Sequence, residues 1–111
     1  MSFTMRKDAS GVVVVGVDGQ LIVSNRHELK QKVLDAADGG ARKILVDFSD
    51  TGYIDSSGLG ALVSLAKKLR EVDGELRLAG LNEDLRTLFE LTKLDTLFTI
   101  TETVDDALKK F

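Results

Sequence analysis

The 111-residue chain contains no cysteine, no proline and no tryptophan, and its only histidine is His27. Without cysteine it cannot form a disulfide, a thiolate zinc site or a cysteine nucleophile. With a single imidazole it cannot build a metal site that requires two histidines. These absences exclude disulfide-stabilised scaffolds and the metal centres based on cysteine and histidine pairs.

Neither sign of charge dominates the chain, and no apolar run is long. Lys and Arg number 15 against 18 Asp and Glu, which gives a net charge of −3 and disfavours nucleic-acid binding, since that requires a basic patch. The longest apolar run, residues 12–15 with Val17 beyond Gly16, is far shorter than the ~20 residues of a membrane span. Residues 1–8 lack the apolar core of a signal peptide. We therefore expect a cytoplasmic protein without a membrane or nucleic-acid partner.

Apolar residues along the chain alternate between strand and helix spacing. Strands are predicted at residues 3–7, 12–17, 44–48, 75–78 and 97–100. Four helices are predicted between and after them, each preceded by residues that cap helices: Ser24 or Asn25, residues 55–57, Asn82, and Thr101 or Thr103. Residues 50–55 are expected to form a loop, and glycines 39, 40 and 74 to end the first two helices. The pattern predicts an α/β fold, a mixed sheet of about five strands packed by about four helices.

One segment is not explained by packing alone, and it reads Tyr53-Ile54-Asp55-Ser56-Ser57-Gly58-Leu59-Gly60. It lies where a predicted loop enters a helix, and a helix N-terminus has unpaired N–H groups and a partial positive charge. A simple cap is one interpretation, since residues 55–57 all suit that role. The two glycines disfavour it, because each costs about 1 kcal/mol against alanine within a helix. We expect Gly58 and Gly60 to leave the backbone bare, so that another protein can approach the serines.

The exposed hydroxyl of this segment is predicted to be that of Ser56, with Ser57 as the alternative. If Ser57 caps the helix, its oxygen is engaged with the first turn and Ser56 points outward. Phosphorylation of Ser56 would add a charge of about −1.5 to −2 beside Asp55. At ~6 Å and an effective dielectric near 20, each like-charge contact with a partner costs about 3 kcal/mol, roughly a hundredfold in affinity. One phosphate could therefore switch off an interface without unfolding the chain.

This segment, with Ile44-Leu45-Val46-Asp47-Phe48 before it, resembles the bacterial anti-sigma factor antagonists, the single-domain members of the STAS group (sulfate transporter and anti-sigma antagonist). Further similarity lies in Gly19-x-Leu21, in Gly74, and in the helix that carries Leu85, Leu88 and Phe89. The resemblance covers essentially the whole chain. It implies one STAS domain over residues 1–111, with the mixed sheet of that group.

The resemblance also implies a function and partners. The unmodified protein would bind an anti-sigma factor that is itself a serine kinase, and the sigma factor would be released. The kinase would phosphorylate Ser56 and end the binding, and a serine phosphatase would restore it. The chain itself would be no enzyme and need no cofactor. The implied partner surface comprises Asp55, Ser56, Ser57, Gly58, Leu59 and Gly60.

Ile22 stands where members of the group often carry an aspartate, at a loop that the resemblance assigns to the contact with the kinase. Ser24, Asn25 and Arg26 could make that contact instead.

Another interpretation keeps the fold without the switch, as a docking subunit of a signalling assembly or a lipid-transport complex. A serine hydrolase is disfavoured, since the segment lacks Gly-x-Ser-x-Gly and His27 is the only histidine available as a base. Asp47, Asp50 and Asp55 could hold magnesium, but such carboxylates more often cap helices or face water. A monomer is expected, and weak dimerisation is left open.

Overall fold

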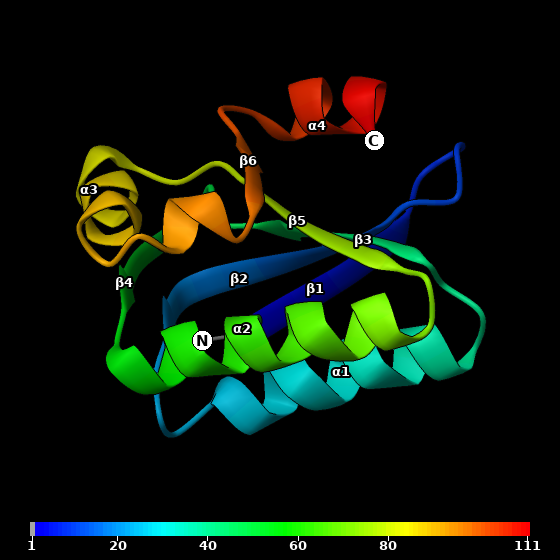
Figure 1. Cartoon of the computed structure of the whole chain (residues 1–111), viewed down its shortest axis with the longest axis horizontal. Helices are drawn as coiled ribbons and strands as arrows, with labels where there is room; N and C mark the ends of the chain where they lie inside the picture. The colour runs from blue at the N-terminus through cyan, green and yellow to red at the C-terminus, as the bar shows by residue number, and fades with distance from the viewer. Residues whose placement is uncertain (1) are drawn as a thin grey trace.

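The computed structural model describes residues 2–111 (Figure 1). Its strands are β1 (Ser2–Lys7), β2 (Val13–Leu21), β3 (Lys43–Asp47), β4 (Thr51–Ile54), β5 (Glu75–Ala79) and β6 (Thr99–Thr101). Its helices are α1 (Arg26–Asp38), α2 (Ser56–Glu71), α3 (Glu83–Leu91) and α4 (Val104–Lys110), with a short 3-10 helix η1 (Leu94–Thr96). The predicted α/β fold is confirmed, with one strand more than expected.

The strands form a mixed sheet in the order β1-β2-β3-β5-β6, in which only β1 runs antiparallel to its neighbour. β3 pairs with the first part of β2, and β4 pairs with its last residues, where Leu21 lies opposite Ile54. The expectation of a loop over residues 50–55 is therefore wrong for residues 51–54. The buried Thr51 hydroxyl donates to the Val17 carbonyl over 2.5 Å, and Ile54 enters the core. These long-range contacts make a strand of a segment too short to show a strand pattern.

Helices cover both faces of the sheet. α1 and α2 lie side by side on one face, and α4 lies on the other (Figure 1). Val13, Val15 and Val17 of β2 belong to the large core cluster that includes buried residues of α1 and α2. Val12 and Val14 belong to a smaller cluster that includes Ala107 of α4. The run of valines is thus buried from both sides, as its lack of alternation predicts.

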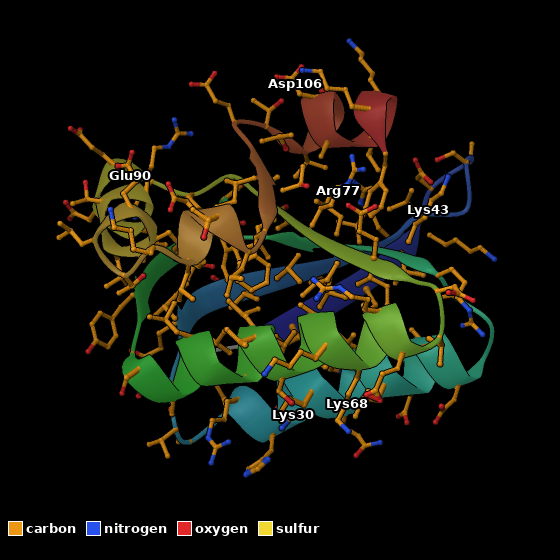
Figure 2. All side chains as sticks on the ribbon, in the orientation of Figure 1. Lys30, Lys43, Lys68, Arg77, Glu90 and Asp106 are labelled. Atoms are coloured by element: carbon orange, nitrogen blue, oxygen red, sulfur yellow. The ribbon has the colours of Figure 1, made fainter. Side chains whose placement is uncertain are left out.

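The face under α4 is also held by Arg77 of β5, which points toward that helix (Figure 2). Its guanidinium lies 4.4 Å from the centre of the Phe111 ring, donates to the Lys110 carbonyl over 3.0 Å, and pairs with Glu75 at 2.8 Å. At the end of the sheet near β4, α3 packs through Phe89, whose ring meets Phe98 edge to face at 6.1 Å. The contacts of Arg77 with Lys110 and Phe111 therefore hold α4 against the sheet, and the contact of Phe89 with Phe98 packs α3 against the chain before β6.

The starts of α3 and α4 and the end of α1 follow the predictions from the sequence, but the end of α2 does not. Asn82 and Thr103 cap α3 and α4 as predicted, accepting from the backbone N–H groups of Leu85 and Asp106. α1 ends before Gly39 and Gly40, again as predicted. α2 ends at Glu71, however, and the left-handed residue after it is Asp73 (φ 60°) instead of Gly74, whose N–H donates to the Leu69 carbonyl.

The last strand also differs from its prediction, since β6 covers Thr99–Thr101 instead of residues 97–100. η1 occupies the chain just before it, and Phe98 is buried while Leu97 is 53% exposed. Leu97 and Phe98, which the sequence pattern assigns to a strand, therefore lie in the turn before β6, and this turn places the Phe98 ring in the core. None of the helices within residues 2–111 has the length and apolar character needed to cross a lipid bilayer.

Candidate functional site

The C-terminal ends of β2 and β4 meet at the N-terminus of α2. The Asp55 N–H donates to the Leu21 carbonyl over 3.1 Å, and α2 begins at the next residue, Ser56. The helix thus starts at the edge of the sheet, with its first turn beside the loop between β2 and α1. The residues around this start, Ser24 to Arg26 and Asp55 to Gly60, are called the α2 tip below.

Asp55 is the N-cap of α2 and holds the α2 tip together. Its Oδ1 accepts hydrogen bonds from the Gly58 N–H over 2.8 Å and from the Ser57 hydroxyl over 2.7 Å. Its Oδ2 accepts from the Val23 N–H over 3.1 Å, which ties the β2–α1 loop to the helix. These hydrogen bonds, first that from Ser57, hold the pKa of Asp55 below its ordinary value. The carboxylate therefore stays ionised and its neighbours stay in place.

The two serines have different environments. Ser57 is half-buried and its hydroxyl donates to Asp55. One interpretation of the sequence makes Ser57 the helix cap, but the cap is Asp55. The Ser57 hydroxyl is nevertheless occupied, because it is hydrogen-bonded to Asp55. Ser56 is exposed, and its hydroxyl has no hydrogen-bond partner within residues 2–111. The prediction that Ser56 presents the outward hydroxyl agrees with this geometry.

The two glycines of the first turn have different roles, which corrects the prediction for one of them. A Cβ at Gly58 would lie 2.6 Å from the Leu21 carbonyl oxygen and 3.0 Å from Cγ2 of Ile54. Gly58 is therefore glycine so that α2 can pack closely on β2 and β4, and not to bare the backbone to a partner. Gly60 is exposed, and a Cβ there would meet nothing within 4 Å. Leu59 is only 8% exposed and belongs to the core.

The loop between β2 and α1 also differs from expectation at Asn25. Its side chain is 6% exposed, accepts from the Ile22 N–H and donates to the Gln20 carbonyl, both over 2.8 Å. Asn25 therefore braces the loop and offers almost no surface to a partner. Ser24 is exposed and Arg26 half-buried. The accessible part of the predicted partner surface is reduced to Ser24, Arg26, Asp55, Ser56, Ser57 and Gly60.

Comparison with known proteins assigns the chain to a family. The model of the STAS domain matches residues 4–107. The chain belongs to the STAS family. An anti-sigma-B factor antagonist of Staphylococcus aureus is 35% identical to it over 88 residues, which cover 79% of this chain and 82% of that protein. The family indicated by the sequence motifs is thereby confirmed.

Solved structures show that the fold is the STAS fold as well. The crystal structure of a candidate anti-sigma factor antagonist from Thermotoga maritima has a TM-score of 0.89 at 29% identity, covering 97% of this chain and 92% of that one. SpoIIAA of Bacillus in its phosphorylated form has a TM-score of 0.76 at 23% identity, covering 98% of each chain. At that identity the second likeness concerns the fold alone.

Two exposed apolar residues beside the α2 tip of this STAS domain were not among the predicted site residues. Val23 is 62% exposed and Tyr53 is 56% exposed. The sequence gives little sign of either, since Val23 continues the apolar pattern of β2 and Tyr53 lies in a segment predicted to be a loop. Their exposure follows from their place at the edge of the sheet, just where β2 and β4 end.

Two of the three carboxylates considered as magnesium ligands have hydrogen-bond partners, and the third, Asp50, is exposed. Asp47 accepts from both the N–H and the hydroxyl of Ser49, and Asp55 caps α2. Within residues 2–111 no three His, Cys, Asp or Glu side chains are grouped so as to hold a metal ion. His27 is exposed near the start of α1. The α2 tip presents the exposed hydroxyl of Ser56 at the start of the helix, and the β2–α1 loop beside it presents that of Ser24.

Acid should weaken the α2 tip through Asp55. Because its pKa is lowered on folding, the stabilisation from its ionised form is complete above the unfolded-state pKa near 3.8 and is lost as the pH falls through the lower folded-state pKa. The melting temperature of the wild type should therefore exceed that of Asp55→Asn at neutral pH, by a margin that shrinks below about pH 4.

This margin is measured by thermal unfolding followed by circular dichroism from pH 7 down to pH 2. Asp8→Asn is a second case of the same effect, since the Ser10 hydroxyl likewise lowers the pKa of Asp8 in the turn after β1, and its margin should also shrink in acid. Asn can still cap a helix through its one carbonyl oxygen, but its Nδ2 cannot accept from the Val23 N–H as Oδ2 of Asp55 does. The part of the margin that changes with pH therefore reports the charge, and the part that does not change reports the lost hydrogen bond. A margin for Asp55→Asn that does not change with pH would contradict the assignment.

Proposed function

We propose that the chain is an anti-sigma factor antagonist that works by partner switching. In its unmodified form it binds an anti-sigma factor with serine kinase activity through the α2 tip, and the sigma factor is released. The observation that carries this proposal is the exposed, unengaged hydroxyl of Ser56 among residues that the fold holds in place. The relative from Staphylococcus aureus, an anti-sigma-B factor antagonist, supports the partner class.

The switch is phosphorylation of Ser56. The kinase transfers the terminal phosphoryl group of ATP to the Ser56 oxygen, ADP leaves, and a serine phosphatase later removes the phosphate by hydrolysis. The phosphate stands at the positive end of α2, where an anion is favourable, so the fold persists. SpoIIAA, which shares the fold, exists in a phosphorylated form. In this proposal the chain acts by binding, as one STAS domain over residues 1–111, and catalyses no reaction itself.

Phosphate incorporation tests the assignment of the switch to Ser56. Incubation with ATP and the anti-sigma factor kinase of the same organism should add one phosphate to the wild type and none to Ser56→Ala. Ser57→Ala is the matched control and should still accept one, because its hydroxyl is not the outward one. Intact-protein mass spectrometry measures the stoichiometry.

One phosphate on Ser56→Ala would move the switch to Ser57 or elsewhere. A wild-type protein that the kinase binds but never modifies would instead be a docking subunit without a phosphorylation switch.

A further inference from the structure

Two exposed apolar side chains come from different elements that meet at Asp55. Val23 follows the end of β2, and its N–H lies 3.1 Å from Oδ2 of Asp55. Tyr53 lies in β4, two residues before Asp55. They are 62% and 56% exposed, whereas their neighbours Leu21 and Ile54 are buried. Apolar surface is therefore left in water next to the phosphorylatable residue.

Both residues lie within reach of anything that reaches Ser56. Tyr53 and Ser56 are three residues apart, so their Cα atoms are separated by at most ~10 Å. The Val23 N–H donates a hydrogen bond to Asp55, the residue that directly precedes Ser56. Tyr53 leaves the sheet on the face opposite to Ile54, since consecutive strand residues point to opposite faces, and Ile54 belongs to the main core.

An interface of ordinary size centred on Ser56 has the reach to cover these side chains. A kinase must bring the terminal phosphate of ATP to the Ser56 oxygen, and a stable interface buries roughly 800 Å² on each side. A disc of that area has a radius of about 16 Å, which exceeds the distance from Ser56 to either residue. Ser56, Ser57 and Gly60 themselves supply little apolar area.

We propose that Val23 and Tyr53 are the apolar anchors through which the anti-sigma factor kinase holds the α2 tip. This inference rests on the proposed function and names the side chains that provide its affinity. A few residues near the centre of an interface carry most of the binding energy, and tryptophan, tyrosine and arginine are enriched among them whereas valine is not. Tyr53 is therefore the main anchor and Val23 the smaller one. The kinase therefore presents an apolar pocket on each side of the site that receives the serine.

The affinity of alanine and serine variants for the kinase tests the anchors. Tyr53→Ala should weaken binding at least about thirtyfold, which is the range of a central aromatic residue. Val23→Ser should weaken it about tenfold, because a smaller apolar area is lost. Tyr53→Phe retains the ring and should bind within about threefold of the wild type. Titration calorimetry with the kinase and ADP measures each constant, so that no phosphate is transferred.

The chain offers matched controls that are exposed but remote. Met5, 43% exposed, lies on β1 opposite Val15, six residues before the end of β2 and so about 20 Å from the tip. Val72, also 43% exposed, follows the far end of the 16-residue α2, about 24 Å away. Met5→Ala and Val72→Ser should bind within about twofold of the wild type.

The outcomes separate this inference from the function on which it rests. If Tyr53→Ala and Val23→Ser bind like the controls while Ser56→Asp loses binding, the anchors are wrong and the switch stands. If Ser56→Asp binds as tightly as the wild type, the proposed function fails and the anchors fail with it. Circular dichroism checks that each variant is folded, and Val23→Ser decides the matter alone if Tyr53→Ala does not fold.

Discussion

Ser56→Asp should reduce the affinity for the anti-sigma factor kinase about a hundredfold while the protein stays folded. The carboxylate places a negative charge at an interface that has formed around a neutral hydroxyl, and one like-charge contact at ~6 Å costs about 3 kcal/mol at an effective dielectric near 20. Within the chain the same charge is at the first residue of α2, where acidic side chains are stabilising. The melting temperature should therefore be equal to that of the wild type or slightly higher.

Ser56→Asn is the matched control for this prediction, because it has nearly the same shape as Ser56→Asp without the charge. Its affinity should lie within about tenfold of the wild type when both are measured by titration calorimetry. Equal losses in the two variants would show that size and not charge disrupts the interface. An unfolded Ser56→Asp protein would show that the position is structural and that the hydroxyl is not merely displayed.

Gly58→Ala and Gly60→Ala should have opposite effects on stability, although the two positions are only two residues apart near the start of α2. The new Cβ at Gly58 would lie 2.6 Å from the backbone carbonyl oxygen of Leu21, which cannot move without shifting β2. Overpacking of this kind costs about 1–3 kcal/mol, and the contact with a backbone atom indicates the upper part of that range. The melting temperature of Gly58→Ala should fall by roughly 10 °C.

At Gly60 nothing surrounds the new Cβ within 4 Å, so the substitution brings only the higher helix propensity of alanine, up to about 1 kcal/mol. Gly60→Ala should raise the melting temperature by a few degrees. Thermal unfolding of the two variants beside the wild type measures both changes. A Gly58→Ala protein as stable as Gly60→Ala would contradict the close packing of α2 on β2.

The elements that the sequence predicts well are those whose signal is local and repeated. The valines of β2 and the apolar spacing of α2 indicate a doubly covered sheet and a core-facing helix without any tertiary information. β4 has no such signal, because its four residues become a strand only through pairing with the end of β2 and through the Thr51 hydroxyl. The exposed position of Tyr53 depends on that pairing and could not be predicted from the sequence.

At the site, the sequence indicates which residues are important, but it does not show which neighbours each of them contacts in the folded chain. Two glycines in a first turn indicate that something lies close to the backbone, yet the neighbour of Gly58 is Leu21 of the same chain, and only Gly60 is open. Asn25 suits either a cap or a loop brace, and the structure shows the brace. Such choices depend on long-range packing, which a local motif does not contain.

One phosphate on Ser56 should end binding to the kinase while the fold stays intact. This prediction is tested most directly by titrating the anti-sigma factor kinase, with ADP bound, with the unmodified protein and with the same protein fully phosphorylated at Ser56. The dissociation constant of the phosphorylated protein should be at least about a hundredfold larger, with an unchanged circular dichroism spectrum. Equal dissociation constants for the two forms would contradict the prediction.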